Sequence, residues 1–244
     1  MITLYTFGPF LGTPDSSPFV MKTMVLLKLA DLEYRQQSGG LFRAPKGLLP
    51  FIEDDGKVIA DSTFIRFHIE RKYGIDFDAG LSARDRATAW SVEKMVEDHL
   101  YWALLDLRWT NRANFERGIA TMFDVLPAPA RPLARRIMRR RTIARTRGHG
   151  MGRNSRDDIE QLAIRDLDSI AAILADKPYL IGEQPCAADA AVFGMVAAFL
   201  TPTLDSPVIE AARNHPNLVR YRDRAMARWF QSREEPAQAA GSAG

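Results

Sequence analysis

The sequence has a single cysteine, Cys186, and no long uninterrupted hydrophobic run. A lone cysteine excludes a disulfide within the chain and favours a reducing compartment, so we expect a cytoplasmic protein. The most apolar stretch, residues 187–204, contains Asp189 and Pro202. It therefore predicts a buried core helix rather than a membrane span. No basic segment precedes an apolar run at the start of the sequence, and we expect no signal peptide.

Acidic residues are absent from residues 126–156, a segment that contains ten arginines. A solvated helix face is the simplest interpretation of such a basic segment. Two alternative roles stay open for residues 131–156. One is attachment to an anionic membrane surface, and the other is capture of an acidic protein partner. Nucleic acid is disfavoured as a partner, because no aromatic side chain is interleaved with the arginines.

A chain of 244 residues is long enough for two modest domains, and its pattern changes after residue 77. Short β-type runs and helical patterns alternate before that point, whereas helical patterns follow throughout. We expect one domain at residues 1–77 and an all-helical one at 84–232. The small and polar residues at 233–244 predict a disordered tail.

The first domain opens with a strand pattern at residues 2–7. The Ser-Pro pair at 17–18 then opens a helix, with serine as N-cap and proline in the first turn. In that helix an apolar face is expected to pack inward, which leaves Lys22 and Lys28 on the solvent side. The next strand is expected at residues 32–35.

A β-hairpin follows, because two short apolar runs flank the Asp-Gly turn at residues 55–56. Pro50 begins the first of these runs, where a strand tolerates a residue without an N–H. Ser62 is expected to cap a helix that ends at Gly74. The resulting β-α-β-β-β-α order is the thioredoxin-like order, with the first two strands parallel.

The second half predicts helices throughout. One long helix is expected over residues 83–109 and another over 115–125. The arginine-rich helix should end at the glycines within 148–152. Ser155 starts the next helix as part of a capping box with Asp158.

A proline that enters a hairpin, followed by an acid–serine pair that opens a helix, resembles the glutathione-binding half of a glutathione S-transferase. The run LLPFIEDDGKVIADSTFIRFHIE, residues 48–70, is similar to bacterial relatives of the failed-axon-connections and metaxin branch. Residues 148–159, GHGMGRNSRDDI, resemble a loop of that branch. Cys186 and Asp189 match the transferases' Ser/Thr-x-x-Asp capping box, with cysteine as a poorer acceptor at the N-cap.

The resemblance implies an α/β thioredoxin-like N-terminal domain joined to an all-α C-terminal domain, with glutathione as co-substrate. The backbone of Leu49 would bind the cysteinyl part of glutathione like an added strand, if the bond to Pro50 is cis. Asp61 would bind the ammonium of the γ-glutamyl end, and Ser62 its carboxylate. The alternative is that Ser62 only caps the helix and Asp61 only complements the helix dipole.

The same resemblance places the glutathione thiolate at the start of the first helix. Ser17 would donate to the thiolate there, with Ser16 as the alternative donor. Unpaired N–H groups and the positive end of the helix dipole lower a thiol pKa at such a place. The alternative is that Ser17 is an N-cap and nothing more. A dithiol mechanism is excluded, because neither Ser17 nor Val20 is a cysteine.

An electrophile pocket is implied between the loop after the first strand and the long helix. Its expected lining is aromatic and consists of Phe7, Phe10, Tyr101, Trp102 and Trp109. The alternative is that these residues belong to the ordinary core, as aromatic residues at helical spacing more often do. No metal site is expected, because the four histidines lack metal-ligand spacing: His68, His99, His149 and His215.

The resemblance implies a glutathione transferase, an enzyme in which glutathione thiolate attacks a small hydrophobic electrophile, acting as a homodimer. A metaxin-like binding or scaffold protein without turnover is the first alternative. A glutathione-dependent lyase or dehalogenase is the second.

Overall fold

A four-stranded mixed sheet organises the first part of the chain, in a computed structural model that describes residues 1–231. The central strand β1 (Ile2–Thr6) pairs in parallel with β2 (Tyr34–Ser38) and antiparallel with β3 (Phe51–Asp54). The hairpin partner β4 (Lys57–Ala60) follows an Asp-Gly turn in which both residues have positive φ. The hairpin prediction is therefore confirmed. The tail predicted at 233–244 lies outside the described residues.

The second strand differs from its prediction. It runs over Tyr34–Ser38, whereas the sequence indicated residues 32–35. Its position is decided by backbone pairing, since Ile2 aligns with Tyr34 and Thr6 with Ser38. The strand lies at the edge of the sheet and its side chains are largely exposed, so an apolar pattern could not mark it.

Two helices flank the sheet, α1 (Pro18–Leu29) and α2 (Ser62–Tyr73). Gly74, with φ of 66°, ends α2 as predicted. Lys28 is exposed as expected, but the expectation for Lys22 is wrong, because its side chain is fully buried. Helix α1 is covered on nearly all sides, and the buried ammonium is held by carboxylates from a distant helix.

The helical region begins at Ala83. Its elements are α3 (Ala83–Met95), the π-helical turn η2 (Val96–Leu100), α4 (Tyr101–Trp109), α5 (Arg112–Arg117), η3 (Ile119–Val125), η4 (Ala128–Ala130), α6 (Arg131–His149), η5 (Met151–Arg153), α7 (Arg156–Leu174), α8 (Ala187–Phe199), α9 (Pro207–Arg213) and α10 (Pro216–Phe230). One short 3₁₀ turn, η1 (Leu41–Arg43), belongs to the sheet region.

The helix predicted over 83–109 is continuous but contains η2, which the sequence did not indicate. The helix predicted over 115–125 is broken. It divides at Gly118 into α5 and the 3₁₀ helix η3, where a Cβ would lie 3.0 Å from the carbonyl oxygen of Asn114. The arginine-rich helix ends at Gly150 and the next helix is capped by Ser155, both as predicted.

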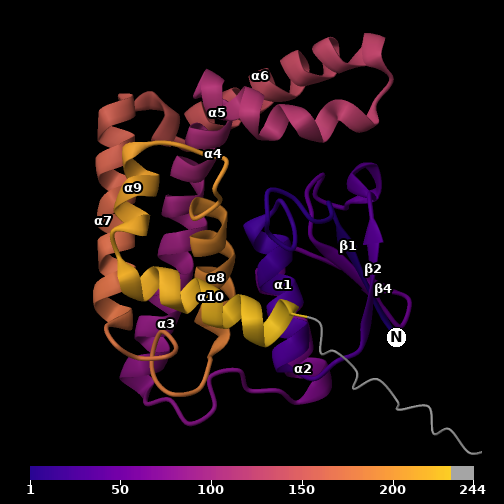
Figure 1. Ribbon diagram of the computed structural model, residues 1–244. Coiled ribbons are helices and arrows are strands. Elements are labelled where there is room, and N and C mark those ends of the chain that lie inside the picture. The colour runs from indigo at the N-terminus through magenta and orange to yellow at the C-terminus, as the bar shows by residue number, and fades with distance from the viewer. Residues whose placement is uncertain (232–244) are drawn as a thin grey trace, which may run out of the picture.

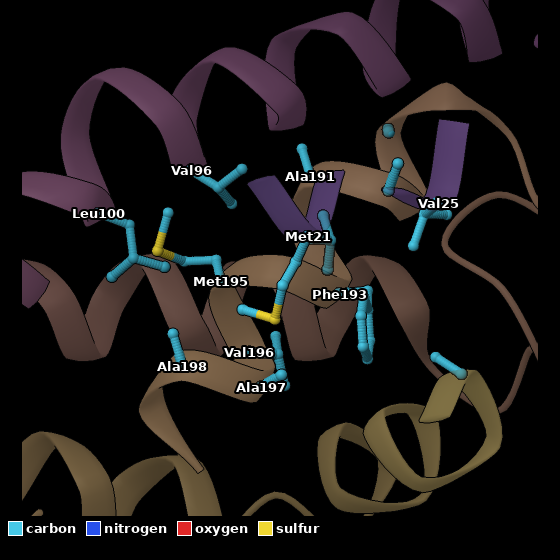
Figure 2. Close-up of a cluster of buried hydrophobic side chains, with 14 of the residues drawn as sticks. Met21, Val25, Val96, Leu100, Ala191, Phe193, Met195, Val196, Ala197 and Ala198 are labelled. Carbon is cyan, nitrogen blue, oxygen red and sulfur yellow. The ribbon is translucent and has the colours of Figure 1, made fainter. Parts of the chain in front are cut away.

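The core joins the sheet region to the helical region through α1 and α8, and every residue of α8 is buried. Figure 2 shows Met21 and Val25 of α1 gathered with Val96 and Leu100 of η2 and with side chains of α8. The helices approach closely, because a Cβ on Gly194 would lie 2.5 Å from the Pro18 carbonyl oxygen. This architecture confirms the predicted thioredoxin-like domain joined to an all-α region.

Figure 1 shows α6 and the segment before it projecting from the helical region as an arm above the sheet region. Among residues 1–231, no helix is long and apolar enough to cross a membrane. The domain limits at residues 77 and 84 stay predictions.

Candidate active site

A cleft of about 330 Å³ lies where the sheet region meets the long helix and α6. A volume of this size is within the range of small-ligand sites. Four residues predicted to bind glutathione line it together with two of the predicted aromatic residues. The full lining is Phe19, Lys46, Leu48, Leu49, Pro50, Asp61, Ser62, Thr63, Lys94, Glu97, Asp98, Tyr101, Trp102 and Arg145.

One wall of the cleft is the backbone just before β3. The Leu49–Pro50 peptide bond is cis. Within residues 1–231, neither the N–H nor the C=O of Leu49 makes a hydrogen bond, so both can pair with an extended ligand backbone. The Pro50 carbonyl accepts from Asp61 N–H at 3.2 Å, which ties this wall to the start of α2.

The start of α2 differs in detail from its prediction. Asp61, not Ser62, is the N-cap, and its carboxylate accepts from Thr63 N–H at 3.0 Å. Asp61 has φ of 82°, an uncommon conformation that recurs at functional sites. Ser62 is therefore already helical, and its hydroxyl makes no hydrogen bond within residues 1–231. Because the cap is taken by Asp61, that hydroxyl and the helix N-terminus remain available to an anionic group.

Asp61 also contacts a cation. Its Oδ2 lies 3.2 Å from Nζ of Lys46, and both side chains are substantially exposed. The pair thus offers one negative and one positive group to a zwitterionic ligand at the cleft mouth. Exposed pairs of this kind contribute little to stability, which leaves both groups free to exchange partners.

The loop between β1 and α1 is organised by Asp15, which is fully buried. Its carboxylate accepts from the N–H groups of Phe7, Gly8 and Ser17 at 2.8–2.9 Å. Burial raises the pKa of Asp15 to about 6, although these three donors favour the ionised form. The carboxylate therefore holds the backbone that leads into α1, and it titrates near neutral pH.

Ser17 is the N-cap of α1, and its Oγ accepts from Val20 N–H at a long 3.5 Å. Ser16 is buried, and neither serine lines the cleft. Phe19, two residues after Ser17 in the same first turn of α1, does line it, so both serines lie beside the cleft. A catalytic role for Ser17 or Ser16 stays a prediction.

Only two of the five aromatic residues predicted to line the electrophile pocket lie at the cleft. Tyr101 and Trp102 line the cleft, and the Phe19 ring meets Tyr101 edge-on at 4.6 Å. Trp102 stacks on His149, the last residue of α6, at 4.1 Å. The structure does not bring the other three to this cleft. Phe7 is 38% exposed elsewhere, and Phe10 and Trp109 pack in a separate cluster around α5.

The separation of Phe10 and Trp109 has a local cause. A bridge between Phe10 and Thr13 folds the loop back on itself and directs Phe10 towards α5 and η3. Trp109 is the last residue of α4, about two helical turns beyond Tyr101, so it reaches the same distant cluster.

Charged residues behind the cleft were not predicted from the sequence. Buried Lys22 lies 2.8 Å from Glu93 and 2.5 Å from Glu97, and Arg66 lies 2.7 Å from Glu93. Burial raises the pKa of Glu93, but Lys22 and Arg66 outweigh it and hold the pKa below its ordinary value. Lys94 pairs with Glu97 at the cleft itself.

A signal for this network was present in the sequence. Lysine interrupts the otherwise apolar face of α1. Glu97 follows Glu93 by four residues and Lys94 by three, and both spacings allow side-chain contact on a helix. Within residues 1–231, no three His, Cys, Asp or Glu side chains gather as a possible metal site.

Two family descriptions match the sequence. The one named "Glutathione S-transferase N-terminal domain" covers residues 18–114, and "Glutathione S-transferase, C-terminal domain" covers 163–225. The isoprene-epoxide–glutathione S-transferase of Rhodococcus sp. is 31% identical over 92% of this chain and 97% of its own length.

Two further relatives are less similar in sequence. The failed axon connections protein of Drosophila melanogaster is 28% identical over 94% of this chain, and mouse metaxin-1 is 27% identical over 74%. The matches cover 59% of the length of each of these two relatives.

Solved structures with the same fold include a β-etherase and a glutathione S-transferase. The β-etherase LigF of Sphingobium aligns with a TM-score of 0.62 at 18% identity, covering 93% of this chain and 95% of that one. A glutathione S-transferase of Methylobacterium radiotolerans, in complex with glutathione sulfonate, aligns at 0.60 and 19%, covering 93% and 91%. At these identities the likeness shows the fold alone.

Proposed function

The chain belongs to the glutathione S-transferase superfamily, in its failed-axon-connections and metaxin branch, and from that premise we propose that it is a glutathione transferase. The reaction is attack of the glutathione thiolate on a small hydrophobic electrophile. The observation that carries the proposal is the composition of the cleft. The unpaired N–H and C=O of Leu49, the N-terminus of α2 and an aromatic wall all line it.

Each part of glutathione has a matching group in this cleft. The γ-glutamyl carboxylate meets Ser62 and the first N–H groups of α2, and the γ-glutamyl ammonium meets Asp61. The cysteinyl backbone pairs with the free N–H and C=O of Leu49. Lys46 supplies a cation for the glycyl carboxylate.

The sulfur then lies towards the first turn of α1, where the Ser17 hydroxyl and the positive end of the helix dipole favour the thiolate. Phe19, Tyr101 and Trp102 form the apolar side on which the electrophile packs. Holding both reactants at contact supplies most of the rate enhancement such a site can give, since it converts a bimolecular reaction into an intramolecular one.

A small epoxide is the electrophile class that we propose, because the relative from Rhodococcus acts on isoprene epoxide. The sulfur attacks an epoxide carbon, the carbon–oxygen bond breaks, and the resulting alkoxide takes up a proton. A lyase or dehalogenase would use the same thiolate, but the likeness to the β-etherase concerns the fold alone and does not favour that alternative.

A scaffold without turnover is the second candidate, supported by the failed-axon-connections and metaxin relatives.

We further propose a cytoplasmic homodimer. An exposed aromatic cluster supports self-association: Phe64, Phe67 and Trp90 are 52%, 37% and 41% exposed, and the rings of Phe67 and Trp90 stack at 6.2 Å. Light scattering at micromolar concentration tests the dimer.

The test of function is incubation with glutathione and isoprene epoxide, with the conjugate measured by mass spectrometry. Turnover above the uncatalysed rate, reduced in Ser62→Ala at subsaturating glutathione, supports the transferase. An aryl chloride in place of the epoxide tests the electrophile class. Glutathione binding without turnover on either electrophile would favour the scaffold, and failure to bind glutathione would contradict both the transferase and its glutathione site.

A further inference from the structure

Arg108 of α4 is a buried cation without a carboxylate partner. Its side chain is 4% exposed, Nη1 donates to the Ser16 carbonyl at 2.9 Å, and Nη2 donates to the Ala198 carbonyl at 3.2 Å. Its Nε–H is buried and has no hydrogen-bond partner. Among residues 1–231, no Asp or Glu forms an ion pair with it. An unpaired buried charge is costly, so its retention calls for an explanation.

The surrounding groups compensate this charge only in part. Ala198 belongs to the last turn of α8, whose C-terminal end carries roughly half a unit of negative charge. The one charged side chain of α8, Asp189, lies at its opposite end. The nearby carboxylate of the β1–α1 loop, Asp15, is occupied by three backbone N–H groups.

The titratable neighbour of the guanidinium is Tyr101, which lines the cleft. Burial raises the pKa of Tyr101, and the charges of Arg145 on α6 and of Arg108 lower it. The effect of burial is larger, so the pKa is raised overall and the phenol is neutral at pH 7. Burial lowers the pKa of Arg108 to about 10, so the guanidinium stays charged at neutral pH. At pH 7 the guanidinium of Arg108 is therefore charged and the phenol of Tyr101 is neutral.

The position of this charge is fixed by Ser16. The Ser16 carbonyl belongs to the peptide unit that ends at Ser17 N, so the guanidinium lies directly behind the first turn of α1. The junction is closed on the α8 side, where Gly194 packs against Pro18 and Ala198 lies in the buried cluster of Figure 2. Little water can enter to screen the charge.

We propose that the missing counterion of Arg108 is the thiolate of glutathione bound at the start of α1. This inference rests on the proposed glutathione site. Arg108 is then a positioning residue, which favours the thiolate over the thiol through space and holds the loop through Ser16. The alternative is a purely structural link between α4, α8 and the loop, in which the charge itself has no role.

The expected effect follows from distance. Covalent geometry puts the guanidinium roughly 6–9 Å from a sulfur at the α1 N-cap. At an effective dielectric constant of about 20, a unit charge at that distance lowers a thiol pKa by about one to two units.

Two variants separate charge from shape. Arg108→Lys keeps the charge and Arg108→Gln removes it, while both lose the two-pronged contact with Ser16 and Ala198. The measurement is ultraviolet titration of the enzyme-bound thiolate at saturating glutathione. We expect Arg108→Gln to raise the thiol pKa by about one to two units and Arg108→Lys to stay within about half a unit of wild type. Equal pKa values in the two variants would overturn the inference.

A third variant keeps the test decisive if neither Arg108 variant folds. Ser17→Ala retains Arg108, so its bound thiol should keep a pKa about one unit or more below that of free glutathione. A return to the free value would overturn the inference. Wild-type protein that does not bind glutathione would remove the proposed function as well, whereas binding with a lowered pKa that is insensitive to the charge at Arg108 would remove this inference alone.

Discussion

Nζ of Lys22 lies 2.8 Å from Oε1 of Glu93, and both side chains are almost completely buried. The pair joins α1 of the sheet region to α3 of the helical region, and Glu97 and Arg66 extend it on either side. A buried ion pair of this kind need not stabilise a protein more than apolar packing would, but breaking it leaves an uncompensated charge.

Lys22→Ala should therefore destabilise the protein by about 3–5 kcal/mol, because Glu93 and Glu97 lose the fully buried cation that contacts both, although Arg66 and Lys94 remain beside them. Lys28→Ala is the matched control on the same helix, since Lys28 is exposed, and it should cost about 1 kcal/mol or less. Urea unfolding measures both. Similar losses for the two variants would show that the buried pair has no special role.

The stability of the protein should depend on Asp15 in a defined pH window. Its folded-state pKa of about 6 is raised above the reference value of 3.8, so the folded state binds the extra proton between these values. The contribution is fully present below about pH 4 and is lost as pH rises through about 6. A shift of about two units corresponds to about 3 kcal/mol.

The measurement for Asp15 is the free energy of unfolding of wild type minus that of Asp15→Asn, followed from pH 4 to pH 7. The difference should fall with pH and then level off, because asparagine does not titrate. A difference that rises with pH would mean that the three N–H donors outweigh burial and hold the pKa below its ordinary value.

Most of the fold could be predicted from the sequence because its signals are local. The Asp-Gly turn, the helix end at Gly74 and the cap at Ser155 each depend on the conformation of a few consecutive residues. The edge strand β2 and the break at Gly118 depend on pairing and packing with distant segments. No local pattern encodes them.

The cleft was predicted on its backbone side and less well on its helical side. Leu49, Asp61 and Ser62 lie within one short stretch, and the resemblance of that stretch to glutathione S-transferases assigned them to one site. The burial of Lys22 depends on carboxylates 71 and 75 residues away. The rule that lysine faces water could not anticipate them. The loop that directs Phe10 away from the cleft is equally a matter of tertiary structure.

The arginine-rich helix α6 (Arg131–His149) is predicted to adsorb to anionic membranes. Arg136, Arg140 and Arg141 are exposed and make no side-chain hydrogen bond within residues 1–231, whereas Arg139 holds the carbonyls of Trp109 and Thr110. Replacing the three exposed arginines by Gln should weaken adsorption to anionic vesicles at low salt. About 1 kcal/mol per charge amounts to roughly a hundredfold, and added salt should abolish the effect.

A control triple with the same change of net charge is Arg84, Arg165 and Arg220, exposed arginines on other helices. It should leave vesicle adsorption nearly unchanged. Equal adsorption by the two triples, or adsorption that is insensitive to salt, would remove the membrane hypothesis and leave a solvated face.

Ser17→Ala tests the predicted thiolate donor. Loss of one hydrogen bond to the thiolate, worth about 1.5–3 kcal/mol, should lower the rate at neutral pH about ten- to a hundredfold. The rate should partly recover as pH rises and the thiol ionises unaided. Ser155→Ala is the control, because it removes the N-cap of α7, away from the cleft, and should lose only stability, about 1 kcal/mol. An unchanged pH–rate profile in folded Ser17→Ala would move the role to Ser16 or remove it.

The central claim is that the cleft binds glutathione, and calorimetric titration with glutathione tests it most directly. Wild-type protein should bind at millimolar concentration or below. Asp61→Ala and Ser62→Ala should each weaken binding by about 1.5–3 kcal/mol, because each removes a hydrogen bond to a charged group of the ligand. Asp157→Ala, an exposed acid in the first turn of α7, should bind like wild type. Absence of heat with wild-type protein at millimolar glutathione would contradict the account.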